Sequence, residues 1–142
     1  MPVLPADGSS TSQRALEEIE RLARRAAAAA ESDRARLARR IAARLRRLPG
    51  EVPPEAAARW LLESLERSTW VGFADARGRT CRAAAVEALL ALGYPWALHV
   101  TPEDLEHYRA QSRRAGGSRA ALGRALRRIL RAFTGRPRID LS

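Results

Sequence analysis

Apolar residues recur at helical spacing along the first third of the chain. Between Gln13 and Leu48 no glycine or proline occurs, and an apolar residue or alanine returns every three or four positions. These positions are Leu16, Ile19, Ala23, Ala26, Ala30, Leu37, Ile41, Leu45 and Leu48. They form one stripe at about 100° per residue, which favours a single helix over residues 13–48. Such a helix is about 50 Å long at ~1.5 Å per residue, so part of it should project, bend or bind a partner chain. The alternative is two helices, with Ser32 as the cap of the second.

Turn and capping residues divide the rest of the chain into shorter helices. Pro49 and Gly50 predict the end of the first helix. Thr80 and Thr101 are predicted N-caps, because a threonine hydroxyl accepts hydrogen bonds from first-turn amides. Gly93 predicts a helix end. The helices expected from these signals cover residues 54–68, 80–92, 101–114 and 118–134. Residues 69–79 are expected to form a loop with a short extended piece.

The chain has the length of one domain, and its composition favours helices. A length of 142 residues lies in the usual range for a single domain. Alanine is abundant, and only two Phe, two Tyr and three Trp are present, which suits closely packed helices better than sheets. We predict an all-α fold, a small bundle of about five helices with a long N-terminal helix. Residues 1–12 are a predicted disordered leader, and residues 13–135 a single helical domain made of the long helix 13–48 and a bundle over 53–135. Residues 136–142 are a predicted flexible tail.

Positive charge is the most informative feature of the composition. All 26 basic residues are arginine and face 16 carboxylates, which leaves a formal net charge of +10. The use of arginine in place of lysine reflects GC-rich coding and fits a bacterial source. The excess of bases over acids attracts polyanions whichever basic residue supplies it. This excess is concentrated in two segments: residues 13–50 hold 11 arginines and 5 acids, and residues 118–142 hold 7 arginines and 1 acid.

In both basic segments the arginines lie opposite the apolar stripe of a predicted helix. The arginines so placed are Arg124, Arg127, Arg128 and Arg131 in the last helix, and Arg36, Arg39, Arg40, Arg46 and Arg47 in the first. All of them except Arg46 are candidate contacts with nucleic acid. Guanidinium forks match phosphate oxygens in geometry and charge. The main hypothesis is therefore a non-catalytic protein that binds the backbone of DNA or RNA without sequence specificity. The alternative for each helix is an arginine face that is only solvated.

A second hypothesis is a helical adaptor or scaffold subunit that binds a larger protein. Trp70 and Phe73, in the predicted loop, are its candidate contact residues. The long helix over residues 13–48 also offers a seam through which two copies of the chain could form a homo-oligomer. Alanine fills most of that seam before Leu37. The partner is thus predicted to be nucleic acid or a larger protein.

Residues that commonly carry catalysis or bind metals are sparse. Cys81 is the only cysteine and lies at a predicted helix N-terminus, a position that can lower the pKa of a thiol. We expect it to be a small buried apolar residue instead. His99 and His107 are the only histidines, and Glu103 lies four residues before His107, a spacing that can chelate a metal. No further ligand group completes that pattern, and no phosphate-binding glycine motif or nucleophile elbow occurs. We predict no enzyme activity, no metal site and no cofactor.

Two coarse resemblances and the hydropathy complete the analysis. Residues 82–98 resemble the helix-to-helix step of a HEAT repeat, but no second copy follows, and such arrays need about three units. In size, helicity and charge the chain is similar to the small subunits of CRISPR effector complexes, which implies a helical subunit of a nucleoprotein complex. No motif carries this similarity. No run of about 18 apolar residues and no signal-peptide pattern occurs, so we expect a cytoplasmic protein without a membrane span.

Overall fold

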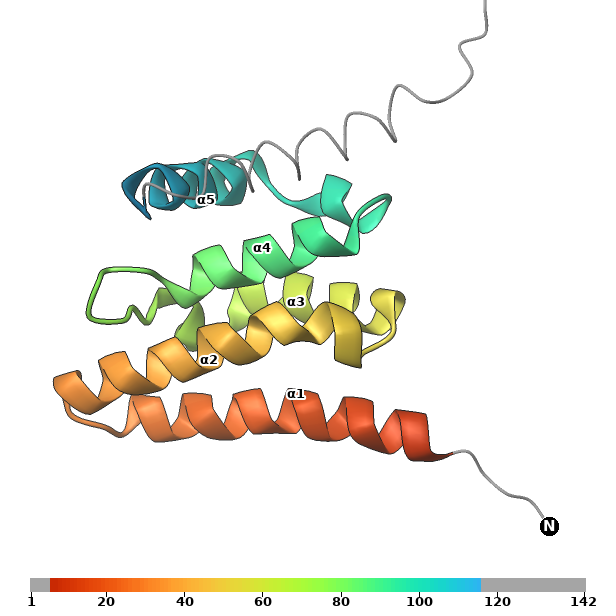
Figure 1. Ribbon diagram of the computed structural model, residues 1–142, viewed down its shortest axis with the longest axis horizontal. Coiled ribbons are helices and arrows are strands. Elements are labelled where there is room, and N and C mark those ends of the chain that lie inside the picture. The colour runs from red at the N-terminus through yellow and green to blue at the C-terminus, as the bar shows by residue number, and fades with distance from the viewer. Residues whose placement is uncertain (1–5, 116–142) are drawn as a thin grey trace, which may run out of the picture.

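The computed structural model describes residues 6–115, and within them the chain is almost entirely helical (Figure 1). The helices are α1 (Ala6–Ala27), α2 (Glu31–Glu51), α3 (Pro54–Arg67), α4 (Cys81–Leu92) and α5 (Pro102–Ala115), with 3-10 turns η1 (Thr69–Gly72) and η2 (Trp96–His99). The described residues contain no strand, and their one extended pairing is an isolated bridge between Ala74 and Thr80. The predicted all-α bundle of about five helices is confirmed.

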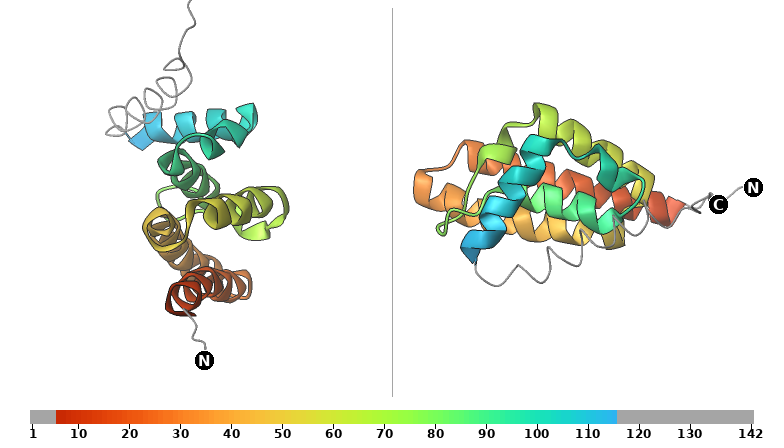
Figure 2. Two further views of the ribbon diagram at one scale, coloured as in Figure 1. Left: turned by 90° about the vertical axis from the view of Figure 1, so that its right-hand side faces the viewer. Right: turned by 90° about the horizontal axis from the view of Figure 1, so that it is seen from above.

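Successive helices run up and down, and α4 lies at the centre (Figures 1 and 2). It packs against α2, α3 and α5 and against both 3-10 turns. Eight of its 12 residues are buried, most of them alanine or leucine. A helix with apolar residues on most sides is a core helix, and the only charged residues of α4 are Arg82 and Glu87. The α1–α2 turn, the loop before α4 and the C-terminal end of α5 all lie at one end of the molecule.

A turn between Ala27 and Glu31 divides the region that was expected to form one helix. α1 and α2 lie side by side as an antiparallel hairpin (Figure 1). The prediction of one continuous helix over residues 13–48 is therefore wrong. The reason lies in packing: Ile19 on α1 and Ile41 on α2 are both fully buried in the same core, and most helical stability in proteins comes from such burial.

The turn between α1 and α2 contains no glycine or proline, and the side chain of Arg34 closes it. Arg34 donates from Nε to the carbonyl of Ala26 at 3.0 Å and from Nη2 to the carbonyl of Ala29 at 3.1 Å. Carbonyls at a helix C-terminus lack partners within the helix, so Arg34 caps α1 from α2. Its guanidinium lies 5.6 Å from the ring centroid of Phe73, a cation–π distance.

The ends of the hairpin also differ from the predicted boundaries. Residues 6–12, expected to belong to a disordered leader, form the start of α1. The hydroxyl of Ser12 donates to the carbonyl oxygen of Glu51 at 3.4 Å, so the start of α1 is docked against the end of α2. α2 itself continues through Pro49 to Glu51. Proline lacks an amide hydrogen, but in the last turn this removes a single hydrogen bond and the helix persists.

The remaining boundaries agree closely with the sequence. α3 begins at Pro54, and the Thr80 hydroxyl accepts the amide of Ala83 at 3.1 Å at the start of α4. Gly93 ends α4 with φ 79°, a conformation that favours glycine. The Thr101 hydroxyl accepts the amide of Asp104 at 3.1 Å at the start of α5. The helix predicted over 118–134 and the tail over 136–142 lie outside the described residues. None of the described helices combines the length and hydrophobicity of a membrane span.

Candidate nucleic-acid interface

The exposed side of α2 carries five arginines, which we call the α2 arginine face. They are Arg36, Arg39, Arg40, Arg46 and Arg47, all of them exposed. At 100° per residue they fall within about 120° of one another, and Leu37, Ile41 and Leu45 are buried on the other side. The sequence singled out four of these five, and the structure places those four on one solvent-facing surface. Its length, from residue 36 to residue 47, is about 16 Å at ~1.5 Å per residue.

Few carboxylates compensate this face. Arg36 pairs with Asp33 at 3.8 Å and Arg46 with Glu87 at 3.4 Å. Arg39, Arg40 and Arg47 have no ion pair with any described residue. The arginines of α3 differ, because each of them pairs with the glutamate four residues before it. The positive charge of α2 is therefore less neutralised than that of α3.

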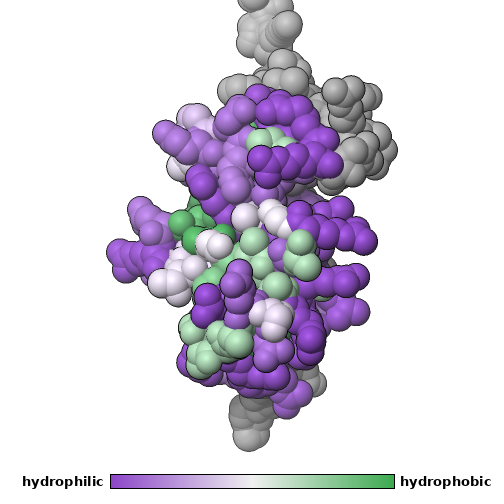
Figure 3. Space-filling model, turned by 90° about the vertical axis from the view of Figure 1, so that its left-hand side faces the viewer, coloured by the Kyte–Doolittle hydropathy of each residue, from purple (hydrophilic) through white to green (hydrophobic). Residues whose placement is uncertain are grey.

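The loop before α4 brings two more arginines to the same surface. A cleft of about 350 Å³ separates this loop from α2. Its lining consists of Ser32, Ala35, Arg36 and Arg39 from α2 and Asp75, Ala76, Arg77 and Arg79 from the loop. Four arginines thus line one cleft with a single acidic residue, Asp75. Figure 3 looks onto this end of the molecule and shows hydrophilic residues on both sides of a central band of neutral and hydrophobic residues.

Local hydrogen bonds fix the loop that presents Arg77 and Arg79. The Oδ1 atom of Asp75 accepts the amide of Arg77 at 2.8 Å and that of Arg79 at 3.0 Å, which is an Asx-type turn. Gly78 completes the turn with φ 82°. Gln111 of α5 holds the loop on both sides of Arg79: its Nε2 donates to the carbonyl of Gly78 at 2.9 Å, and its Oε1 accepts the amide of Thr80 at 2.9 Å. Asp75 is thus committed to the backbone.

Sequence analysis missed Arg77 and Arg79 as binding candidates. The available signal was an aspartate three residues before a glycine, which is typical of a tight turn, with an arginine on each side of that glycine. The sequence did not reveal that the turn faces α2, because this depends on how α4 and α5 pack. The other predicted arginines, Arg124, Arg127, Arg128 and Arg131, lie outside the described residues.

A polar seam joins the start of α4 to α5. Arg82 donates from Nε to Asp104 at 2.6 Å, and the Thr80 hydroxyl lies 2.6 Å from Nε2 of His107. Burial lowers the pKa of His107, the positive charges of Arg82 and Arg114 lower it further, and Asp104 opposes them. No group of three or more His, Cys, Asp or Glu within residues 6–115 is arranged to hold a metal ion.

Cys81 is a buried core residue. It is fully buried at the start of α4, and its thiol points to the carbonyl of Ala38 at 3.5 Å. Burial raises the pKa of the thiol to about 12; the charge of Asp75 adds to this rise, and Arg46 acts against it. The expectation that Cys81 is a small buried residue is confirmed, and its thiol does not have the lowered pKa that a helix N-terminus can produce.

The two aromatic residues proposed for protein contacts are not free surface groups. Trp70 is only 4% exposed, and its ring stacks on that of Trp60 with centroids 5.8 Å apart. Phe73 is half-buried, packs against the core and lies under the guanidinium of Arg34. The expectation that Trp70 is exposed is wrong, since the η1 turn folds it inward. The apolar stripe proposed for self-association is also buried, within the α1–α2 hairpin.

Comparison of the chain with models of protein families, with curated proteins and with solved structures finds no match.

Proposed function

We propose that the protein binds the phosphate backbone of DNA or RNA through the α2 arginine face and the loop that carries Arg77 and Arg79. Binding is without base readout and without catalysis, whether the protein acts alone or as a helical subunit of a nucleoprotein complex. One observation carries the proposal: Arg36 and Arg39 of α2 meet Arg77 and Arg79 of the loop around one cleft. The single carboxylate there, that of Asp75, already accepts two backbone amides.

The physical basis is the release of counterions from the nucleic acid. Each phosphate neutralised by an arginine contributes about −0.9 to the slope of log affinity against log salt on duplex DNA. Four to six contacts predict a slope of about −4 to −5. Guanidinium groups present donors in a planar fork that matches phosphate oxygens. Because such contacts carry no base information, we expect little sequence preference.

The adaptor hypothesis has lost the feature that motivated it. It relied on Trp70 and Phe73 as exposed contacts, and Trp70 lies in the core. The α2 arginine face offers five exposed charged side chains in its place.

The proposal is tested by fluorescence anisotropy with labelled oligonucleotides of mixed sequence, single- and double-stranded, at about 50 mM salt, where charge attraction is least screened. The test variant replaces Arg36, Arg39, Arg77 and Arg79 with Gln. The control replaces Arg14, Arg21, Arg59 and Arg67 with Gln, so that both proteins lose the same charge. Gln is a good helix former, so helicity should persist.

We expect the test variant to bind at least about tenfold more weakly, with a salt slope reduced by about 3. The control should change much less, because its arginines lie away from the cleft. Equal weakening by both variants would show that net charge alone acts and would overturn the site. If the wild-type protein binds neither DNA nor RNA at low salt, the proposed function is wrong.

A further inference from the structure

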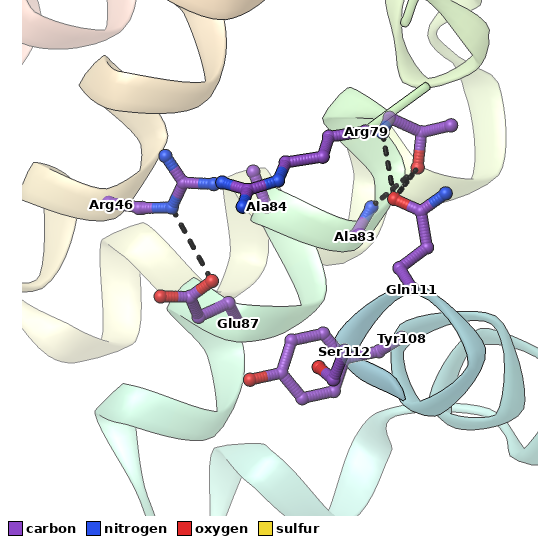
Figure 4. A pocket seen from close by; sticks show the side chains of 9 residues that line it. Arg46, Arg79, Ala83, Ala84, Glu87, Tyr108, Gln111 and Ser112 are labelled. Atoms are coloured by element: carbon purple, nitrogen blue, oxygen red, sulfur yellow. Dashed lines mark hydrogen bonds and ion pairs between the residues drawn. The ribbon is translucent and has the colours of Figure 1, made fainter. Parts of the chain in front are cut away.

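A second, smaller pocket lies where α2, the loop, α4 and α5 meet. Its volume is about 220 Å³. It is lined by Arg46, Arg79, Thr80, Ala83, Ala84, Glu87, Tyr108, Gln111 and Ser112. Figure 4 shows the side chains of Arg46 and Arg79, which come from different elements, pointing toward one another above this pocket. Arg79 also lines the cleft beside α2, so the two hollows are adjacent on the surface.

The charges in this pocket do not cancel. Arg46 donates from Nε to Glu87 at 3.4 Å, an interaction between two side chains that are each about two-fifths exposed. Arg79 has no ion pair with any described residue. The two arginines and one glutamate leave a local charge of +1. This equals in size the single negative charge of a phosphodiester.

The loop holds Arg79 in place before any ligand arrives. The amide of Arg79 is bound by Asp75, and Gln111 grips the residues on either side. Two like charges that point at each other repel in the free protein, and an anion between them relieves that repulsion. Tyr108 and Ser112 add hydroxyl groups to the lining. Burial and the nearby charge of Glu87 raise the pKa of Tyr108, so its hydroxyl keeps its proton and can donate.

We propose that Arg46 and Arg79 together bind one phosphodiester group of the nucleic acid, and that Glu87 competes with this phosphate for Arg46. The inference rests on the proposed function and adds a defined subsite to it. A phosphate oxygen accepts hydrogen bonds from both guanidinium forks, while Glu87 offers Arg46 an intramolecular alternative. Glu87 therefore weakens the subsite, and its removal strengthens binding.

Exposed arginines outside the proposed interface provide matched controls. Arg79→Gln is compared with Arg59→Gln on α3, and Arg46→Gln with Arg21→Gln on α1. Neither Arg21 nor Arg59 lines the pocket. On mixed-sequence duplex DNA, we expect each pocket variant to weaken binding about five- to tenfold and each control no more than about twofold. The Arg46→Gln/Arg79→Gln double variant should lower the salt slope by about 0.9, the value for one shared phosphate, not by about 1.8.

Replacement of Glu87 should change the affinity in the opposite direction to replacement of Arg46 or Arg79. Glu87→Gln should tighten binding about two- to fivefold, and the gain should vanish when Arg46 and Arg79 are both Gln. Glu106→Gln, which removes an exposed carboxylate paired with Arg113 on α5, controls for the general loss of negative charge. Circular dichroism confirms that each variant is folded.

The possible failures are distinguishable. If Arg79→Gln weakens binding no more than Arg59→Gln, or if Glu87→Gln behaves like Glu106→Gln, the subsite is overturned while the wider interface stands. If the double variant lowers the slope by about 1.8, the arginines contact separate phosphates and the shared subsite is wrong. If the wild-type protein binds no nucleic acid, the proposed function and this inference fall together.

Discussion

Arg34 offers the sharpest test of the helical hairpin, because it joins α2 to the end of α1. Replacement by Met keeps the apolar stem and removes the guanidinium. The variant loses two hydrogen bonds, to the carbonyls of Ala26 and Ala29, and the contact with the ring of Phe73. Hydrogen bonds to charged groups contribute about 1.5–3 kcal/mol when well shielded. Arg34 is half-buried, so water replaces part of this, and we take about 1 kcal/mol for each bond.

The cation–π contact adds about 0.5–1 kcal/mol, so the free energy of unfolding should fall by about 2–3 kcal/mol for Arg34→Met. For a domain of this size the corresponding fall in Tm is about 8–12 °C. Urea denaturation, followed by tryptophan fluorescence and by circular dichroism at the helix band, measures the change. The stability of Arg34→Lys should lie between that of the wild-type protein and that of Arg34→Met. An ammonium keeps the charge but cannot donate to both carbonyls as a planar fork does.

Arg36→Met is the control, since Arg36 lies two residues away, has a 77% exposed side chain and pairs weakly with Asp33. It should cost no more than about 0.5 kcal/mol. A double-mutant cycle with Phe73→Leu should give a coupling energy of about 0.5–1 kcal/mol for the ring contact. If Arg34→Met is no more destabilising than the control, Arg34 does not hold the turn, and the account of the hairpin is wrong.

Three further predictions concern reactivity, pH and backbone conformation. Because burial raises the pKa of Cys81 to about 12, a thiol reagent at about pH 8 should react with it only after denaturation; rapid reaction with the native protein would contradict this. The pKa of His107 is lowered in the folded state, so the unfolded state binds more protons just below pH 6.5. Wild-type stability should therefore decrease as the pH falls through this range. His107→Gln should remove that part of the fall and His99→Gln should not, as urea denaturation from about pH 7.5 to 5 will show. Gly93→Ala should lower the free energy of unfolding by about 1 kcal/mol, because Gly93 has a positive φ. Gly50→Ala, at a helical position with open space around it, should raise that free energy by about 0.5–1 kcal/mol. Thermal unfolding of the two variants measures both changes, and changes of the same sign would contradict the prediction.

Local chemistry made much of the fold predictable. Thr80 and Thr101 accept amides only three residues away, and Gly93 ends its helix through its own φ angle. Such signals lie within one turn of the helix that they bound, so the sequence displays them directly. The arginines of α2 were placed correctly for a similar reason, since a face is defined by spacing along one helix.

The α1–α2 hairpin could not be predicted from local sequence signals. The run of alanines from Ala26 to Ala30 has high helix propensity and contains no turn residue. What closes the turn is Arg34, together with Phe73 from a loop 39 residues further on. The stripe of apolar residues is equally compatible with two helices that face each other. Likewise, Arg79 joins the interface through Gln111, 32 residues away, and no local pattern reveals that contact.

The buried alanines between the helices limit which substitutions the core can accept. α2, α3 and α4 meet through buried alanines, among them Ala38, Ala57, Ala58, Ala84 and Ala88. Alanine at such contacts lets helix axes approach closely, and a larger side chain there forces its neighbours to shift. Drift toward larger apolar residues, which most cores tolerate, should be penalised here as strongly as drift toward polar ones. In a saturation-mutagenesis experiment, substitutions along α4 should therefore be the most destabilising, although this helix consists mostly of alanine and leucine.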